Sequence, residues 1–176
     1  MGTEKGVTVE GKTTDKSRVV MAQVMNPLDA NPAGNVHGGS IMKLIDTVAG
    51  AVARRHTRTN VVTASIDRLD FHSPVFIGDF LTLKASLTMV GRTSMEVGVR
   101  VETENLATGD VRHTASAYVT IVALGDDSKP TEVPPLILET DEEIRRNREA
   151  KARRRMRLEE RKKEKACQDN SENCVP

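Results

Sequence analysis

One carboxylate on an apolar segment, preceded by two adjacent glycines, is the arrangement in this sequence best suited to chemistry. Asp46 lies within AGNVHGGSIMKLIDTVAGAVA, residues 33–53, and Gly38 and Gly39 stand eight and seven positions before it. Apolar residues recur there at helical spacing, so we expect a helix that begins near the glycines. Its first N–H groups would lack intrahelical acceptors and could stabilise a developing negative charge. Asp46, about two turns further on, could act as a base or a nucleophile.

Each of these residues also has a structural explanation. An aspartate on such a helix can simply bond a neighbouring strand, and the glycines can serve only the turn into the helix. Asn35 beside a glycine is a common turn residue. We expect Ser40 or the glycines to start the helix, and we expect the helix to bury Asp46, which would favour its use as a base.

Polar and apolar residues alternate in the segments that surround this helix. Strands are predicted over 17–25 before it and over 61–71, 79–90, 94–104 and 111–123 after it, whereas the helix should end near 54–56. The short turns between the later strands predict an antiparallel sheet whose covered face packs on the single helix. Open sheet edges would favour pairing between subunits.

Three segments of the chain together are similar to a known family. GNVHGGSIMKLIDTVAG, NVVTASIDRLDFHSPVFIGD and GRTSMEV follow in this order, and they closely resemble the hot-dog-fold acyl-CoA thioesterases of the YciA and brain acyl-CoA hydrolase type. The resemblance covers residues 17–143 without an obvious gap. It implies an α+β hot-dog fold, with an antiparallel sheet wrapped around one central helix. It also implies hydrolysis of acyl-CoA to a free fatty acid and coenzyme A.

The resemblance further implies roles for individual residues. Asp46 matches the family's catalytic carboxylate, which either attacks directly or activates water. Asn35 matches an asparagine that holds the water or the carbonyl and comes from the opposite subunit, so composite sites are expected. The backbone N–H of Gly38, with that of Gly39 as a second candidate, would bind the oxyanion.

Hydrolysis of a thioester needs few catalytic groups, because its leaving group is a good one. The leaving thiol has a pKa of about 8.5, so the thiolate leaves without a strong general acid. One carboxylate and amide donors can therefore suffice without a serine or cysteine nucleophile. This fits the sequence, which has no GxSxG nucleophile motif and no cysteine in residues 17–125. Beyond the catalytic groups, we expect substrate contacts from His37, Gly39, Arg92, Thr93 and Ser94. A hairpin arginine is often merely solvated, and Arg54, Arg55 and Arg58 are weaker candidates for the phosphates.

Composition restricts the remaining classes. Charged residues make up 29% of the chain with a net charge of +1, and aromatics only 2%, so no nucleic-acid partner is expected. No apolar run approaches the roughly 20 residues of a membrane span, and the N-terminus lacks a secretory apolar region, so a cytoplasmic location is expected. No cofactor is expected, and the histidines lack metal-ligand spacing: His37, His56, His72 and His113.

The chain divides by composition into five parts. We expect a flexible N-terminus over 1–16, the hot-dog domain over 17–125, a linker over 126–139, a basic helix over 140–167 and a disordered tail over 168–176. Thr140 and Glu143 would form a capping box at the start of the basic helix. A solvated helix is the favoured interpretation, and binding to RNA, an anionic membrane or coenzyme A phosphates is the alternative.

The remaining expectations concern the assembly, two rival functions of the core and an adaptor role of the tail. We expect a homo-oligomer built from dimers, as a trimer of dimers and hence a hexamer. A non-catalytic acyl-CoA sensor would bind the ester without turnover. A hot-dog hydratase or dehydratase would pair a histidine with a carboxylate, and an adaptor role would depend on the basic tail.

Overall fold

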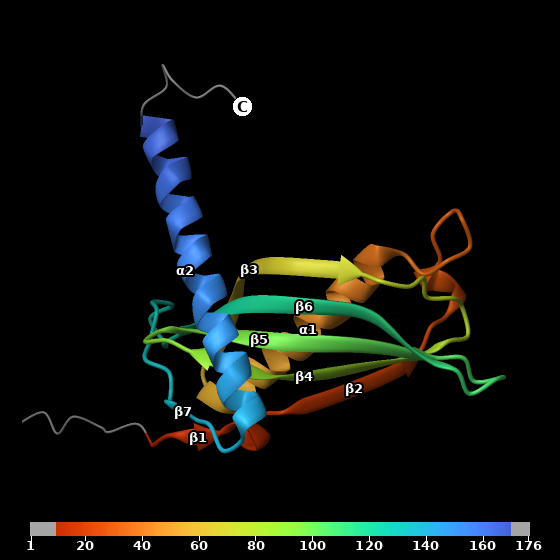
Figure 1. Cartoon of the computed structure of the whole chain (residues 1–176), viewed down its shortest axis with the longest axis horizontal. Coiled ribbons are helices and arrows are strands. Elements are labelled where there is room, and N and C mark those ends of the chain that lie inside the picture. Colours follow the sequence, from red (N-terminus) through yellow and green to blue (C-terminus); the bar gives the residue numbers. More distant parts are fainter. Residues whose placement is uncertain (1–9, 170–176) are drawn as a thin grey trace, which may run out of the picture. The chain divides into compact units, whose positions relative to one another are not determined.

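The sheet domain follows the predicted order of one strand, one helix and four strands. The structure, a computed structural model, describes residues 10–169. Figure 1 shows the elements along the chain. They are β1 (Lys12–Thr13), η1 (Thr14–Lys16), β2 (Val19–Val24), η2 (Pro27–Asp29), α1 (Gly38–Thr57), β3 (Asn60–Phe71), β4 (Phe80–Val90), β5 (Ser94–Glu104), β6 (Val111–Leu124), β7 (Leu136–Ile137) and α2 (Asp141–Asp169).

Five strands form one antiparallel sheet in the order β2-β4-β5-β6-β3. The helix between β2 and β3 therefore separates two strands that end up on opposite edges. The predicted strands are confirmed to within a few residues, because side-chain alternation with a period of two is a strong signal in a sheet with one covered face. Both β2 and β3 are left with one unpaired side in the described chain.

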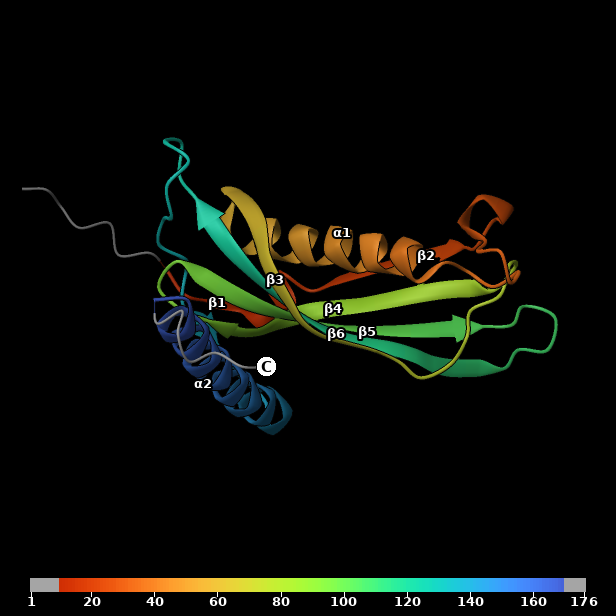
Figure 2. The ribbon, with the colours of Figure 1, turned by 90° about the horizontal axis from the view of Figure 1, so that it is seen from above.

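The core lies between α1 and the sheet, and Figure 2 shows α1 running along one face of the strands. The helix turns an apolar stripe inward, made of residues that are at most 2% exposed: Ile41, Ile45, Val48, Ala49 and Val52. The facing side of β4 is equally buried, with Leu81, Leu83, Ala85 and Leu87. Each fully buried aliphatic side chain contributes about 1.5–3 kcal/mol. This packing confirms the α+β hot-dog fold.

Two short segments are more structured than expected. The sequence predicts a flexible N-terminus over 1–16 and a linker over 126–139, but β1 pairs in parallel with β7, and Lys12 N–H donates to the Pro135 carbonyl at 2.9 Å. The end of α1 joins this pairing, since Nε2 of His56 lies 2.8 Å from the Pro134 carbonyl oxygen. Strands of two residues leave no alternation to recognise in a sequence.

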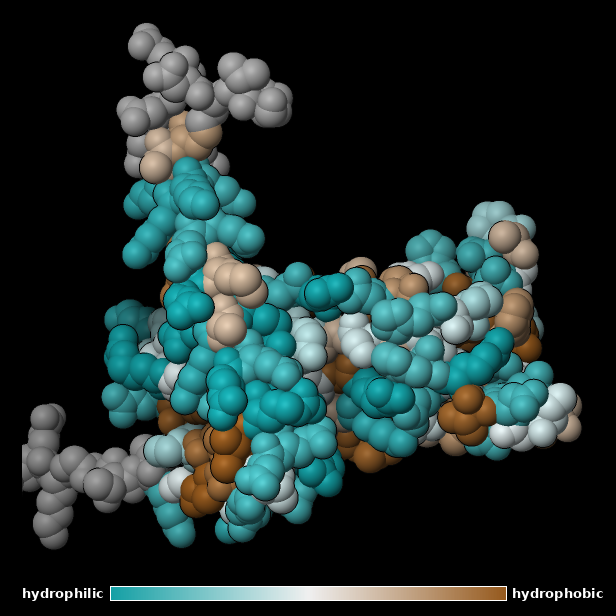
Figure 3. Space-filling model, in the orientation of Figure 1, coloured by the Kyte–Doolittle hydropathy of each residue, from teal (hydrophilic) through white to brown (hydrophobic). Residues whose placement is uncertain are grey.

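The helix α2 belongs to a second compact unit that begins at Glu139. The predicted capping box is present: Glu143 N–H donates to Thr140 Oγ1 at 3.2 Å, and Thr140 N–H donates to Glu143 Oε2 at 3.2 Å. Hydrophilic side chains cover most of this helix in Figure 3. Cys167 is disulfide-bonded, and the tail predicted beyond it lies largely outside the described residues. Within residues 10–169, no helix is long and apolar enough to cross a membrane.

Candidate functional site

A histidine, rather than Ser40, caps the start of α1. Nδ1 of His37 accepts a hydrogen bond from Gly39 N–H at 2.8 Å, and the His37 carbonyl accepts one from Ser40 N–H at 2.9 Å. A Cβ on Gly39 would lie 2.9 Å from His37 Nδ1, so the cap requires glycine there. Gly38 N–H has no acceptor among the described residues. Of the two expected oxyanion donors, the N–H of Gly38 is therefore free and that of Gly39 is engaged.

The loop before the helix is organised around Asn31. Its side-chain Oδ1 accepts hydrogen bonds from Ala33 N–H at 2.9 Å and from Asn35 N–H at 3.2 Å. Its backbone N–H donates to the Asn35 carbonyl at 2.7 Å. The side-chain Nδ2 of Asn31 has no acceptor within residues 10–169, so this loop presents a fixed amide donor.

This loop and the segment that ends β3 and follows it line an open cavity of about 350 Å³. Its walls are Asn31, Asn35, Val36, Gly38, Ile41, Phe71, His72, Ser73, Pro74 and Val75. Only His72 among these can titrate, and none is a carboxylate. His37, which was expected in the pocket, caps the helix instead and does not line this cavity. The cavity therefore supplies amide donors and apolar contacts but no base of carboxylate type.

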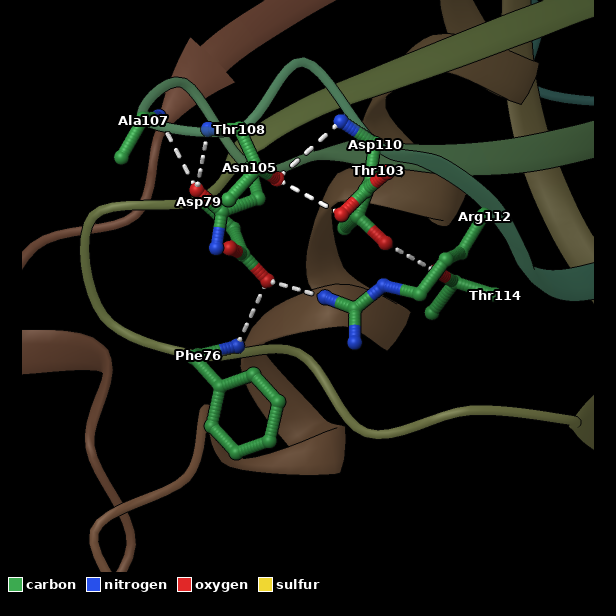
Figure 4. A network of polar contacts seen from close by, with 9 residues as sticks. All are labelled: Phe76, Asp79, Thr103, Asn105, Ala107, Thr108, Asp110, Arg112 and Thr114. Carbon is green, nitrogen blue, oxygen red and sulfur yellow. Dashed lines mark hydrogen bonds and ion pairs between the residues drawn. The ribbon is translucent and has the colours of Figure 1, made fainter.

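An ion pair between the buried Asp79 and the partly exposed Arg112 lies next to the Val75 wall of the cavity, and Figure 4 shows its contacts. Oδ2 of Asp79 lies 2.9 Å from Nη2 of Arg112 and accepts the Phe76 N–H at 3.0 Å. The Arg112 guanidinium also stands 5.5 Å from the centroid of the Phe76 ring. The segment held in this way bonds the loop before α1, because Val36 N–H donates to the Val75 carbonyl at 2.8 Å.

The carboxylate of Asp46 lies elsewhere, on the outward side of α1. Its Oδ1 accepts a hydrogen bond from the Thr63 hydroxyl at 2.6 Å. Thr63 belongs to the edge strand β3 and sits at a bulge, where the pairing with β6 shifts between Thr63 and Ser65. Asp46 is exposed, so the expected burial is wrong for the single chain. Sequence reasoning missed Thr63, because its contact with Asp46 depends on how β3 packs beside α1.

One chain therefore carries two separate groups of candidate residues. We call Asp46 with Thr63 the carboxylate half-site, and Asn31 with Gly38 the amide half-site. Eight residues of helix separate Gly38 from Asp46, which is about 12 Å at 1.5 Å per residue. A carboxylate and an oxyanion donor acting on one carbonyl must both approach it to hydrogen-bonding distance, about 3 Å. The two half-sites of one chain cannot meet this condition.

The predicted substrate contacts in the β4–β5 hairpin lie far from the cavity within one chain. The strand β4 starts directly after the cavity wall, and its eleven residues span about 35 Å before Arg92 and Thr93 are reached. The Arg92 carbonyl accepts the Val133 N–H at 2.9 Å, and the Thr93 carbonyl accepts the Ala123 N–H at 3.0 Å. The Arg92 side chain is exposed. The role of Arg92, Thr93 and Ser94 stays a prediction.

Residues 33–109 match the family model described as the thioesterase superfamily. The chain is 41% identical over 137 residues to the uncharacterized acyl-CoA thioester hydrolase YkhA of Bacillus subtilis, which covers 78% of this chain and 80% of that protein. It is 38% identical over 146 residues to the cytosolic acyl coenzyme A thioester hydrolase of rat, covering 82% of this chain. The match spans only 38% of the rat protein's length.

Two solved structures share the whole domain. An apo-hexameric acyl-CoA thioesterase is 38% identical with a TM-score of 0.83, covering 86% of this chain and 97% of that one. The acyl-CoA hydrolase of Staphylococcus aureus, solved with butyryl coenzyme A and coenzyme A, is 32% identical with a TM-score of 0.83, covering 90% and 97%.

The Staphylococcus aureus hydrolase has also been solved with single alanine replacements of an asparagine, an aspartate and a threonine. The numbers of those positions place the asparagine fifteen residues before the aspartate and the threonine seventeen residues after it. In this chain Asn31 stands fifteen residues before Asp46, and Thr63 stands seventeen residues after it, whereas Asn35 is only eleven before. Asn31 thus stands at the same spacing from Asp46 as the replaced asparagine from its aspartate, and its side chain also orders the loop.

Proposed function

We propose that this chain, which belongs to the acyl-CoA thioester hydrolases of the thioesterase superfamily, hydrolyses acyl-CoA to a fatty acid and coenzyme A. The observation that carries the proposal is the pair of half-sites. A hydroxyl-held carboxylate stands on the outward side of α1, and a free backbone N–H with a fixed amide stands at the helix start. Together they supply the base, the oxyanion donor and the positioning group that thioester hydrolysis needs.

The complete site is formed between two subunits of a homo-oligomer. Asp46 and Thr63 of one subunit act with the partner subunit's Asn31 and the partner subunit's Gly38. The separation of about 12 Å along the helix requires such a partner. The unpaired side of β3, with Val62 43% exposed, offers an edge for the pairing. The hexameric relative supports a trimer of dimers.

The chemistry follows from the atoms that the half-sites leave free. Thr63 occupies Oδ1 of Asp46, so Oδ2 is available to take a proton from water or to attack the carbonyl carbon itself. Either attack places negative charge on the carbonyl oxygen, which the N–H of Gly38 stabilises. The carbon–sulfur bond then breaks, and the thiolate leaves or takes back the proton held by the carboxyl group. In the direct route, water subsequently hydrolyses the mixed anhydride.

Two asparagines compete for the positioning role. Asn35 was the residue predicted for it, and it lines the cavity together with Asn31. We favour Asn31, because its free Nδ2 is held in place by the bonds to its Oδ1 and because its spacing to Asp46 fits the replaced asparagine of the Staphylococcus aureus protein. Asn31→Ala should lower turnover far more than Asn35→Ala, and the reverse order would give the positioning role to Asn35.

Release of free thiol from short-, medium- and long-chain acyl-CoA tests the activity. Asp46→Asn keeps an acceptor for Thr63 but cannot take up a proton, so turnover should fall by about a hundredfold or more. Asp127→Asn, an exposed carboxylate in a loop, is the matched control and should leave turnover unchanged. If the wild-type protein binds acyl-CoA but turns over no chain length, the chain is a sensor and not a hydrolase.

Mixing two inactive variants tests the composite site. In a heterodimer of Asp46→Asn and Asn31→Ala subunits, one of the two sites combines an intact Asp46 with the partner subunit's intact Asn31. Random reassembly makes half of the dimers mixed, so activity should return to roughly a quarter of the wild-type value. No recovery after verified subunit exchange would place both residues in the same subunit.

A hydratase is less well supported, because the cavity that contains His72 has no carboxylate among its described walls. Hydration of an enoyl-CoA without thiol release would nevertheless establish it. The proposed partners are acyl-CoA and coenzyme A, which the Staphylococcus aureus structures contain. The cytosolic name of the rat relative supports a cytoplasmic location for this chain.

A further inference from the structure

A second cavity lies at the other end of α1. It has a volume of about 320 Å³ and is lined by Ala51, Arg54, Arg55 and Arg58. All three charged residues around it are cations, and no acidic residue lines it. Arg54 stands eight residues beyond Asp46, about 12 Å along the helix and in the direction away from Gly38. The cavity is thus distinct from both half-sites.

The guanidinium groups around this cavity are not neutralised. Arg54 and Arg58 form no side-chain hydrogen bond or ion pair within the part of the chain that the structure describes, and each offers five N–H donors. Arg55 donates from Nη1 to the Arg18 carbonyl at 2.6 Å, which orients its side chain without adding negative charge. The carboxylate of Asp15, three residues before Arg18, pairs with the Arg18 guanidinium at 3.0 Å.

Arg58 occupies a position where an arginine is unusual. It ends α1 with φ 61° and ψ 16°, the left-handed conformation that glycine adopts most readily. Its backbone N–H donates to the Arg54 carbonyl at 2.8 Å, and a glycine would make the same bond. Cations near a helix end also complement the helix dipole, which accounts for Arg54 and Arg55. The dipole does not require an arginine side chain at the left-handed position of residue 58.

We propose that Arg54, Arg55 and Arg58 bind the phosphate groups of a phosphorylated ligand. Arginine suits this task, because its planar N–H donors match phosphate oxygens in pairs. The phosphates can come from the 3′-phospho-ADP portion of coenzyme A, in which case the inference rests on the proposed function, or from a separate nucleotide.

The hairpin with Arg92 supports a basic end of the sheet domain. Val133 bonds the Arg92 carbonyl, while the carbonyl of the next residue, Pro134, bonds the ring of His56 at the end of α1. The hairpin and the arginine cavity are thus tied to consecutive residues and lie at the same end. Arg92 therefore adds an exposed cation to the end of the domain that holds the arginine cavity.

Calorimetric titration with adenosine 3′,5′-bisphosphate tests the site directly. The double variant Arg54→Gln/Arg58→Gln should weaken binding by about tenfold or more, the size of one charge-assisted hydrogen bond lost. The control Arg148→Gln/Lys151→Gln removes the same charge from exposed positions of α2 and should change the affinity less than twofold. Adenosine should bind neither protein, and higher salt should weaken the wild-type affinity.

Arg58→Gly separates binding from folding. Glycine relieves the left-handed backbone, so this variant should unfold at the same temperature as wild type or higher, and yet bind the bisphosphate more weakly. Equal affinity of wild type, Arg58→Gly and the double variant would overturn the proposal, as would an equal loss in the α2 control. Loss of acyl-CoA turnover alone would not affect this result.

Kinetics identify the source of the phosphates. If coenzyme A supplies them, the double variant should raise KM for butyryl-CoA by about tenfold and leave KM for S-butyryl pantetheine, which lacks the phosphates, unchanged. If a separate nucleotide supplies them, KM for butyryl-CoA should stay constant while the bisphosphate affinity still falls. Both results support the phosphate site, and unchanged affinity and unchanged KM together reject it.

Discussion

Replacing Asp79 by asparagine removes the charge that anchors one wall of the amide-bearing cavity. The Asp79 side chain is 5% exposed and serves both Arg112 and the Phe76 N–H. Breaking a buried pair costs about 3–5 kcal/mol, because it leaves an uncompensated charge behind. Arg112 is 34% exposed and can recover some hydration, so we discount this to about 2–3 kcal/mol.

Urea and thermal unfolding at a fixed protein concentration measure this cost. For a domain of this size the unfolding temperature should fall by roughly 4–12 °C. The exposed pair Asp127–Lys129, 61% and 80% exposed, is the matched control, and Asp127→Asn should change stability by less than about 0.5 kcal/mol. A fixed concentration matters, because assembly of subunits adds to apparent stability.

A double-mutant cycle with Arg112→Gln isolates the pair. We expect a coupling energy of about 1.5 kcal/mol or more between the two positions, because the partners share one buried contact. The cavity wall should also loosen, so turnover of Asp79→Asn should fall even under conditions where the protein remains folded. A coupling energy below about 0.5 kcal/mol would show that the ion pair does not hold the wall.

Three further predictions follow from single contacts. Gly39→Ala places a Cβ 2.9 Å from His37 Nδ1 and should break the helix cap, lowering the unfolding free energy by about 1 kcal/mol in urea titrations. Burial, aided by the charge of Lys12, lowers the pKa of His56 below 6.5 despite the opposing Pro134 carbonyl. Stability should therefore be complete above pH 6.5 and fall as the pH drops below it, a slope that His56→Gln should flatten in pH-dependent melts. Thr63→Val should lower kcat by about tenfold with little change in KM, because it removes only the bond that orients Asp46; unchanged kcat would make Thr63 structural.

The strands of the sheet could be predicted from the sequence because apolar and polar residues alternate along each of them as the side chains alternate between the two faces. In β4, Leu81, Leu83 and Leu87 face α1, and the intervening polar residues face away, so the period of two identifies both the strand and its inward side. The apolar stripe of α1 could be predicted from its helical spacing of apolar residues. The pairing of β1 with β7 could not, since it joins strands of only two residues from opposite ends of the domain, with Lys12 opposite Leu136.

The candidate site was predictable only where its chemistry is local. Asp46 and Gly38 could be proposed from the sequence because one helix carries both and its N-terminus is marked by glycines. The sequence predicts that Ser40 or the glycines start the helix, and α1 does begin at Gly38, but the side-chain cap comes from the ring nitrogen of His37. Thr63 reaches Asp46 across seventeen residues of chain, so only the packing of β3 reveals it.

The exposure of Asp46 is what a site shared between subunits requires. A carboxylate buried within its own chain would have to be neutralised or paired there, and it would be lost to a substrate arriving from outside. Here one oxygen is held by Thr63, and the other has no hydrogen-bond partner among the described residues of the domain, although the side chain is exposed. Desolvation, which strengthens both a base and an oxyanion donor, can then come from the second subunit and the acyl-CoA itself. On this view assembly completes the active site, and a stable monomer of this chain should fold, bind coenzyme A weakly and release no thiol.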